Sequence, residues 1–321
     1  MIPRILITGA TGFVGRHLVA QLASQGRPLR LALRRPGTGP VSHPNAASAG
    51  SDIDLAVVGD IGAATDWTAA LDGIDAVVHL AARVHVMRET VSDPLGAFRA
   101  VTTEGSAALA AAAARAGVRR FVHISTAKVL GDTSGAAPLS DDSPAAPGDP
   151  YALAKHEAEQ RLAAIAAATG LAVVTLRPPL VYGPGAGGNW ASLVRLVGRG
   201  VPLPLGAVHN RRSLIALGNL TDAIRLALDH PGLSASPYLV CDGTALSTAD
   251  LVRAIAAAQG RPARLIPVPP KLLQWSLTAL GRSAWVPRLF GNLELDDGRF
   301  VATTRWCRPL DPIAGIRAAV T

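Results

Sequence analysis

The residues from Arg4 to Ala23 read RILITGATGFVGRHLVAQLA and decide the fold of the first part of the chain. Ile5–Ile7 is a short apolar run, typical of a parallel strand that is buried on both faces. Leu18, Val19 and Leu22 then recur at the spacing of a helix. A glycine-spaced turn lies between the two. The segment therefore predicts strand, turn and helix in the order of a dinucleotide-binding βα unit.

Each glycine of this turn has its own expected role. Gly9 permits the tight turn, Gly12 lets the backbone approach a pyrophosphate, and Gly15 lets the helix pack closely on the strand. The next helix offers free N–H groups and the positive end of its dipole to phosphates. The spacing is G-x-x-G-x-x-G rather than G-x-G-x-x-G, so an ordinary tight turn is the alternative. The flanking strand and helix favour dinucleotide binding.

Composition excludes several classes of protein. The 321 residues are enough for two closely joined lobes with a large core. The net charge is +8, but there is no basic run with interleaved aromatics, so we expect no nucleic-acid partner. We also expect no membrane span, and no signal peptide before the first strand. Cys241 and Cys307 lack metal-ligand spacing, which predicts no metal site and two buried thiols in a reducing cytoplasm.

Apolar runs alternate with helical patterns over residues 1–176, which predicts a doubly wound parallel α/β sheet in a dinucleotide-binding domain. The expected strands after the first are residues 29–33, 55–58, 76–82, 121–125 and 171–176. Residues 95–116 and the segment starting near Tyr151 are expected to be helices. Beyond Arg177, prolines and glycines interrupt short helical pieces. We therefore expect a smaller, irregular α/β substrate-binding lobe over residues 177–321, with about 216–240 rejoining the first domain.

The residues after the second expected strand bear on the cofactor. That strand ends in Arg34-Arg35, where an NAD-binding fold usually places an acid, and no acid occurs before Asp52. A carboxylate would repel a 2′-phosphate, whereas a guanidinium can pair with it. The pattern favours NADP over NAD. Ordinary surface arginines are the alternative.

Tyr151 and Lys155 are the expected catalytic pair. On a helix, residues four apart share one face, so the phenol and the ammonium point to the same place. A free tyrosine has a pKa near 10, and a nearby cation lowers it. Tyr151 would then exchange a proton with a substrate hydroxyl or carbonyl while a nicotinamide exchanges the hydride. A surface pair is the alternative.

Six segments of the chain together resemble the extended short-chain dehydrogenase/reductase superfamily, of the nucleotide-sugar epimerase/dehydratase type. They are TGATGFVG (8–15), HLAA (79–82), STAKVLG (125–131), YALAK (151–155), RPPLVYGPG (177–185) and RRSLIALGNLTDAI (211–224). The resemblance implies a Rossmann-type sheet, and a homodimer is usual in the superfamily. Leu130 stands where tyrosine is common, and Thr102-Thr103 where asparagine is usual.

The resemblance also places a cofactor site along the strand ends. It assigns Asp60 and Ile61 to the adenine, and Lys155 to the nicotinamide ribose as well as to catalysis. Asp60 as the N-cap of the next helix is the alternative. With the glycines and arginines above, the expected cofactor-binding set is Gly9, Thr11, Gly12, Phe13, Val14, Gly15, Arg34, Arg35, Asp60, Ile61, Leu80, Ala81, Ala82, Tyr151, Lys155 and Pro178.

The same resemblance implies the substrate residues. Thr126 is the implied third catalytic residue, which would hydrogen-bond the substrate oxygen, although a hydroxyl at a strand end can also be structural. Asn189 and Arg212 would bind the substrate diphosphate. Arg211 is the fallback for Arg212. The expected substrate-binding set is Ser125, Thr126, Arg83, His85, Asn189, Arg211 and Arg212.

Members of the superfamily share a hydride step and differ in the rest of the reaction. A 4,6-dehydratase usually has Asp-Glu after the catalytic threonine, whereas this chain has Ala127-Lys128, which argues against dehydration. Together with Arg34-Arg35, this favours an NADPH-dependent 4-keto reductase of a nucleotide sugar, expected to be UDP-linked. The alternatives are a UDP-hexose 4-epimerase with retained NAD, a reductase of a small non-sugar carbonyl, and a non-catalytic dinucleotide-sensing protein.

Overall fold

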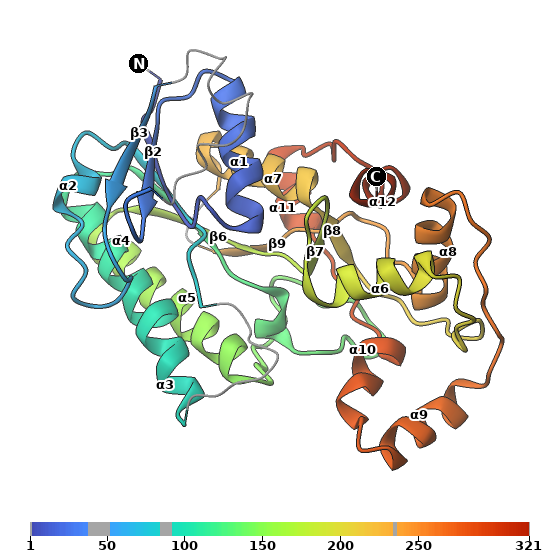
Figure 1. Ribbon diagram of the computed structural model, residues 1–321. Helices are drawn as coiled ribbons and strands as arrows, with labels where there is room; N and C mark the ends of the chain where they lie inside the picture. The colour runs from blue at the N-terminus through green and yellow to red at the C-terminus, as the bar shows by residue number, and fades with distance from the viewer. Residues whose placement is uncertain (1, 38–51, 84–91, 234–235, 321) are drawn as a thin grey trace. The chain divides into compact units, whose positions relative to one another are not determined.

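The computed structural model describes residues 2–37, 52–83, 92–233 and 236–320 (Figure 1). Contacts divide the chain into two compact units, which we describe separately. The first unit comprises Met1–Val129, Ala145–Arg177 and Thr221–Tyr238. The second comprises Leu130–Pro144, Pro178–Leu220 and Leu239–Thr321.

The first unit is built on a seven-stranded sheet. The strands are β1 (Ile5–Thr8), β2 (Leu29–Leu33), β3 (Ile53–Val57), β4 (Ala76–His79), β5 (Arg120–Ile124), β6 (Ala172–Arg177) and β9 (Pro237–Leu239). Their order across the sheet is β3-β2-β1-β4-β5-β6-β9, and the pairs from β3 to β6 are all parallel. The order reverses beside β1, which is where doubly wound sheets bind ligands. The predicted doubly wound fold is confirmed.

Helices flank this sheet. They are α1 (Phe13–Ser24), α2 (Thr68–Leu71), α3 (Pro94–Phe98), α4 (Gly105–Arg115), α5 (Pro150–Thr169) and α7 (Leu217–Asp229). All four residues of β1 and of β4 are buried, because neighbours cover both faces of these central strands. Phe121, Leu109 and Leu162 fill the layer between β5, α4 and α5.

A strand forms as expected around residues 55–58, but the expectation that this strand is buried is wrong. The strand β3 lies at the edge of the sheet, and Leu55 and Val57 are about half exposed. A strand at an edge has a neighbour on one side only, so its apolar residues are covered less well.

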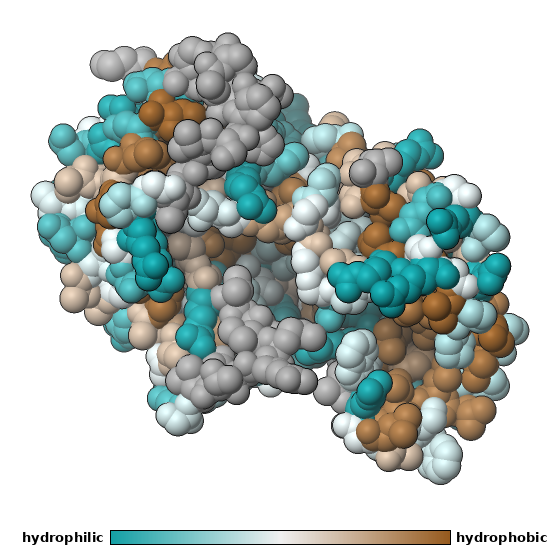
Figure 2. All heavy atoms as spheres, in the orientation of Figure 1, coloured by the Kyte–Doolittle hydropathy of each residue, from teal (hydrophilic) through white to brown (hydrophobic). Residues whose placement is uncertain are grey.

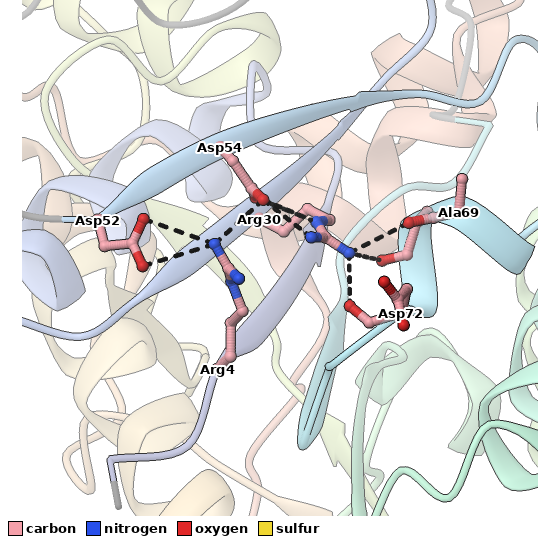
Figure 3. A network of polar contacts seen from close by, with 7 residues as sticks. Arg4, Arg30, Asp52, Asp54, Ala69 and Asp72 are labelled. Atoms are coloured by element: carbon pink, nitrogen blue, oxygen red, sulfur yellow. Dashed lines mark hydrogen bonds and ion pairs between the residues drawn. The ribbon is translucent and has the colours of Figure 1, made fainter.

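A network of arginines anchors this edge (Figure 3). Arg30 on β2 donates to the Asp54 carboxylate at 2.9–3.1 Å, and Arg4 donates to Asp54 at 3.1 Å. The other side of the Arg30 guanidinium donates to carbonyl oxygens at the end of α2, including that of Asp72 at 2.7 Å. One side chain thereby joins strand, edge strand and helix.

The expected helix over residues 95–116 forms with an interruption. A π-helical segment, Arg99–Glu104, separates α3 from α4. It contains Thr102-Thr103, the place where the resemblance expects asparagine. The Thr103 hydroxyl donates to the Ala154 carbonyl of α5 at 2.9 Å, so the segment contacts the helix that carries the expected catalytic pair.

The second unit contains a small parallel sheet and several helices. The strands are β7 (Leu180–Tyr182) and β8 (Leu214–Ala216). The helices are α6 (Gly188–Gly198), α8 (Thr248–Ala258), α9 (Pro270–Ala279), α10 (Val286–Phe290), α11 (Gly298–Thr304) and α12 (Pro312–Val320), with a short 3-10 turn at Ser283–Trp285. Its core includes Trp190, Ile255 and Ile316.

A buried polar network fixes the second unit. The Tyr182 hydroxyl donates to Asp242 at 2.7 Å, and Asp242 also accepts from the Ala216 amide and from Asn219. Asn219 in turn pairs with both backbone groups of Leu310 at 2.8–2.9 Å. Each of these buried polar groups thereby has hydrogen-bond partners, which offset the water lost on burial.

Both cysteines are free thiols, but only one of them is buried. Burial raises the pKa of the Cys241 thiol to about 12. Cys307 is exposed, so the prediction that both thiols are buried is wrong for this residue. None of the described helices is long and apolar enough to cross a bilayer.

Candidate active site

The glycine turn comes directly after β1, beside the point where the strand order reverses. Gly9 has a φ of 69°, and a Cβ there would lie 2.8 Å from the Ala81 amide nitrogen. A Cβ on Gly15 would lie 2.1 Å from the Gly9 carbonyl oxygen. Gly12 has an ordinary φ of −74°, and its Cβ would meet only that carbonyl oxygen, at 3.2 Å. The protein's own packing therefore requires Gly9 and Gly15, whereas Gly12 faces open space, as a ligand cradle requires.

The N-terminus of α1 is suited to phosphate. Gly12 is its N-cap and provides no side-chain hydrogen bond, and the first turn contains no acid. The neighbouring Thr11 is exposed, and Phe13 and Val14 are half-buried. An uncapped helix start with free N–H groups attracts anions. The residues present fit a dinucleotide pyrophosphate.

A chain of buried hydrogen bonds joins the end of β1, just before the glycine turn, to β4 and α4. The Ala81 amide donates to the Thr8 hydroxyl at 3.2 Å, and Thr8 lies 2.7 Å from His79 Nδ1. His79 Nε2 lies 2.9 Å from the Ser106 hydroxyl, which donates to the Thr102 carbonyl. This arrangement places the single imidazole proton on Nε2. Burial lowers the pKa of His79 to about 3, so the ring is neutral and structural.

The other residues expected to bind the cofactor near its adenine lie after β3 and β4. Leu80, Ala81 and Ala82 are half-buried directly after β4. Ile61 packs on α4, where a Cβ on Gly105 would lie 2.7 Å from its Cγ2. Asp60 does not cap α2, which begins at Thr68.

Arg34 has a partner that was not anticipated. Its guanidinium forms an ion pair with Asp60, and both side chains are largely exposed. Arg35 is also exposed at the end of β2. The charge that was expected to attract a 2′-phosphate is therefore partly neutralised by a carboxylate from the next strand's exit.

The start of α5 places the expected catalytic tyrosine. Asp149 is the N-cap and accepts from the Ala152 amide at 2.8 Å, and Pro150 occupies the first turn. Lys128 forms an ion pair with Asp149. Tyr151 therefore sits in the first turn of a helix whose beginning is fixed from two sides.

Tyr151, Lys155 and Glu159 lie on one face of α5, each four residues from the next. The Lys155 ammonium donates to the Ile124 carbonyl at the end of β5 at 2.6 Å. Burial lowers the pKa of Lys155 to about 8, and the charge of Glu159 opposes that shift. The sequence prediction did not include Glu159 in this stripe, although its spacing was readable.

The expectation that Lys155 lowers the pKa of Tyr151 is not met in the protein alone. Burial of the phenol, with the Asp149 carboxylate nearby, raises the pKa of Tyr151 to about 12. The lysine is engaged with the Ile124 carbonyl instead. The tyrosine is therefore a neutral proton donor in this state.

Ser125 and Thr126 come directly after β5 and are both buried. The Ser125 amide donates to the Leu176 carbonyl at 2.8 Å, and the Thr126 hydroxyl accepts from the Lys128 amide at 3.3 Å. Both hydroxyl residues therefore lie at the strand exit next to the carbonyl that holds Lys155.

Phe98 is a neighbour of the tyrosine that sequence reasoning missed. Its ring packs edge-on against Tyr151 with centroids 5.9 Å apart. The Arg83 guanidinium lies over the Phe98 ring, 5.4 Å from the ring centroid. Arg83 is thus placed one ring away from Tyr151. An aromatic residue inside a helical pattern gave no signal of this role. His85 lies outside the described residues.

The expected diphosphate residues belong to the second unit. Asn189 is exposed in the first turn of α6. Arg212 is half-buried, and its guanidinium donates to the carbonyls of Pro287 and Gly291 at 3.1 Å each. Burial lowers the pKa of Arg212, and the charge of Arg288 adds to this, so a second arginine lies close by that the sequence prediction did not include. Arg211 is exposed and paired with Glu294.

Pro178 is buried directly after β6, as the first residue of the second unit's middle segment. Its expected contact with the cofactor remains a prediction, as do the assigned roles of the other site residues.

Comparisons with known proteins show the family to which the chain belongs. Residues 5–241 match the NAD dependent epimerase/dehydratase family. UDP-glucose 4-epimerase of Vibrio cholerae is 40% identical over 308 residues, covering 95% of this chain and 90% of that protein. dTDP-glucose 4,6-dehydratase of Streptomyces niveus is 32% identical over 280 residues, covering 80% and 78%.

A solved structure has the same fold. A double mutant of DesIV, the dTDP-glucose 4,6-dehydratase of Streptomyces venezuelae, with NAD bound, aligns with a TM-score of 0.76 at 25% identity. The alignment covers 99% of this chain and 95% of that one. The chain therefore belongs to the NAD-dependent epimerase/dehydratase family and is an enzyme of the extended short-chain dehydrogenase/reductase type.

Proposed function

We propose that the protein is a 4-epimerase of a UDP-hexose that works with a retained NAD. The observation that carries this proposal is the 40% identity, along nearly the whole chain, to a UDP-glucose 4-epimerase. It favours the epimerase over the 4-keto reductase that the sequence pattern alone had put first.

The residues after Thr126 support epimerisation over dehydration. A 4,6-dehydratase needs an acid/base pair there, and this chain has Ala127 and Lys128. Ala127 is buried, and Lys128 pairs with Asp149, so it helps to hold the start of α5. Neither residue supplies the carboxylates of a dehydration step.

The cofactor proposal changes from NADP to NAD. The ion pair between Arg34 and Asp60 places a carboxylate beside the guanidinium that was expected to bind a 2′-phosphate. A phosphate there would meet that negative charge, whereas ribose hydroxyls can donate to it. DesIV was also solved with NAD.

A bound NAD would supply reversible hydride transfer at C4 of the sugar: the hydride removed from one face of C4 would be returned to the other face, so the configuration inverts with no net oxidation. Tyr151 would accept the proton of the C4 hydroxyl through its phenol oxygen and return it afterwards. In the loaded enzyme, Lys155 would turn from the Ile124 carbonyl, its partner in the protein alone, to the ribose, and its charge would then favour the Tyr151 phenolate. Thr126 would donate to the substrate oxygen. In the second unit, Arg212 and Asn189 would bind the diphosphate.

The test is to incubate the purified protein with UDP-glucose, and separately with UDP-N-acetylglucosamine, without added cofactor. We expect the 4-epimer to appear in the proton NMR spectrum and NAD to be released on denaturation. Tyr151→Phe is the control, which should abolish turnover and keep the bound NAD. An empty cofactor site together with no epimer from either sugar contradicts the proposal.

The 4-keto reductase remains the second candidate because Arg34-Arg35 ends β2 without an acid of its own. It predicts an empty site after purification, tighter binding of NADPH than of NADH, and NADPH consumption with a UDP-4-keto sugar. These outcomes are opposite to those of the epimerase, so one preparation distinguishes the two.

A further inference from the structure

One segment of the second unit combines a run of cations with exposed large apolar side chains. Residues 251–293 contain six cations and no aspartate or glutamate. The cations are Arg253, Arg261, Arg264, Lys271, Arg282 and Arg288. All six are exposed, and of these only Arg253 forms an ion pair with a carboxylate of the described chain.

The same segment exposes large apolar side chains. Trp275 and Leu280 are each 71% exposed, Leu272 is 56% exposed and Trp285 is 44% exposed. Neither α9 nor α10 has a buried residue, and the two pack mainly against each other and the turn between them. Figure 2 shows brown, apolar side chains gathered over these helices. We call Leu272, Trp275, Leu280, Trp285, Lys271 and Arg282 the α9–α10 patch.

The side chains are arranged as on an interfacial helix. Leu272, Trp275 and Ala279 lie on one face of α9 at spacings of three and four residues, and all three are exposed. Lys271 lies in the first turn of α9, and Arg282 lies between α9 and the 3-10 turn that follows it. Tryptophans with basic neighbours are typical of helices that lie at the boundary of lipid headgroups and acyl chains.

We propose that the α9–α10 patch docks the protein on the surface of an anionic lipid bilayer, without spanning it. Charge selects this occupant. Phosphate headgroups complement the cations of the patch, while Trp275 and Leu280 bury apolar area among the acyl chains. In a two-fold dimer formed through the same patch, cations would face cations without a carboxylate to offset them, which disfavours a second copy.

The test is flotation of the full-length protein with vesicles of phosphatidylcholine mixed with phosphatidylglycerol, and with vesicles of phosphatidylcholine alone. We expect binding to the anionic vesicles that high salt weakens. Lys271→Glu combined with Arg282→Glu should weaken it by about 25-fold or more, since each cation contributes about fivefold. Trp275→Ser combined with Leu280→Ser should weaken it by about tenfold or more.

Matched controls make the result specific. Ile313→Ser removes a half-exposed apolar side chain from α12, and Arg115→Glu reverses an exposed cation on α4; both should bind like the wild type. All variants should keep the wild-type unfolding temperature, because the substituted side chains are exposed. The proposal is overturned if the wild type ignores anionic vesicles, or if patch and control variants bind equally. It is also overturned if the patch variants only convert a dimer to monomers.

Discussion

Arg177, the last residue of β6, and Glu159 on α5 form a buried two-pronged ion pair. Nε donates to one carboxylate oxygen at 2.9 Å and Nη2 to the other at 2.5 Å. Both side chains are almost fully buried. Although burial opposes it, the guanidinium keeps the pKa of Glu159 below its usual range. The pair joins the helix of Tyr151 to the strand that ends at Arg177.

Removing one partner of the pair should lower the stability of the fold, because the other partner is left charged and buried. We expect Glu159→Ala to lower the free energy of unfolding by about 3–5 kcal/mol, measured by urea denaturation. The double variant Glu159→Leu with Arg177→Met should recover most of this loss, since two apolar side chains replace the pair without an orphan charge. A single variant as stable as the wild type would show that the pair is not closed in solution.

Lys155 should make stability depend on pH. Its pKa is about 8 in the folded protein and near 10.5 when unfolded, so between these values the unfolded chain binds the extra proton. Stability contributed by this group therefore rises with pH across that window, by about 3 kcal/mol in all. In the protein without dinucleotide, the free energy of unfolding of the wild type should rise relative to that of Lys155→Met between pH 8 and pH 10. A constant difference contradicts a depressed pKa.

Much of the fold could be predicted, and the reason is physical. Strands buried on both faces need unbroken apolar runs, so β1, β4 and β6 are readable as such. The burial of the edge strand β3 was misjudged because its apolar residues are of the same types as those of the central strands. The residue pattern of a strand does not show whether the strand has a neighbouring strand on one side or on both.

The candidate site was predictable to the extent that it depends on local spacing. The glycine turn and the stripe of Tyr151 and Lys155 are set by neighbouring residues. The pairing of Arg34 with Asp60 joins the exits of two strands and was not visible in the sequence. The hydrogen bond from Lys155 to the Ile124 carbonyl, which keeps the ammonium from the Tyr151 phenol, was not visible in the sequence either.

Substitutions at two glycines of the turn, Gly12 and Gly15, should separate an effect on NAD binding from an effect on stability. Gly12→Ala should stay within about 1 kcal/mol of the wild-type stability, because its φ is ordinary and only one atom is near. It should nevertheless lose about tenfold or more in NAD affinity, measured by calorimetry, because the methyl group occupies the open cradle. Gly15→Ala should lose about 3 kcal/mol or more of stability, because its methyl group would collide with backbone. Equal effects of the two substitutions would contradict a cradle at Gly12.

Arg212 and Arg211 are adjacent, so they form a matched pair for the proposed diphosphate site. Arg212 is half-buried and held by two carbonyl oxygens, whereas Arg211 is exposed and paired with Glu294. Arg212→Ala should raise the KM for a UDP-sugar by about tenfold to a hundredfold, the effect of losing a charged hydrogen bond. Arg212→Lys should have a KM between those of the wild type and Arg212→Ala, because lysine keeps the charge without the planar guanidinium. Arg211→Ala should change KM little, since surface pairs contribute little. If Arg211→Ala has the larger effect while both variants unfold at the wild-type temperature, the assignment of Arg212 is wrong.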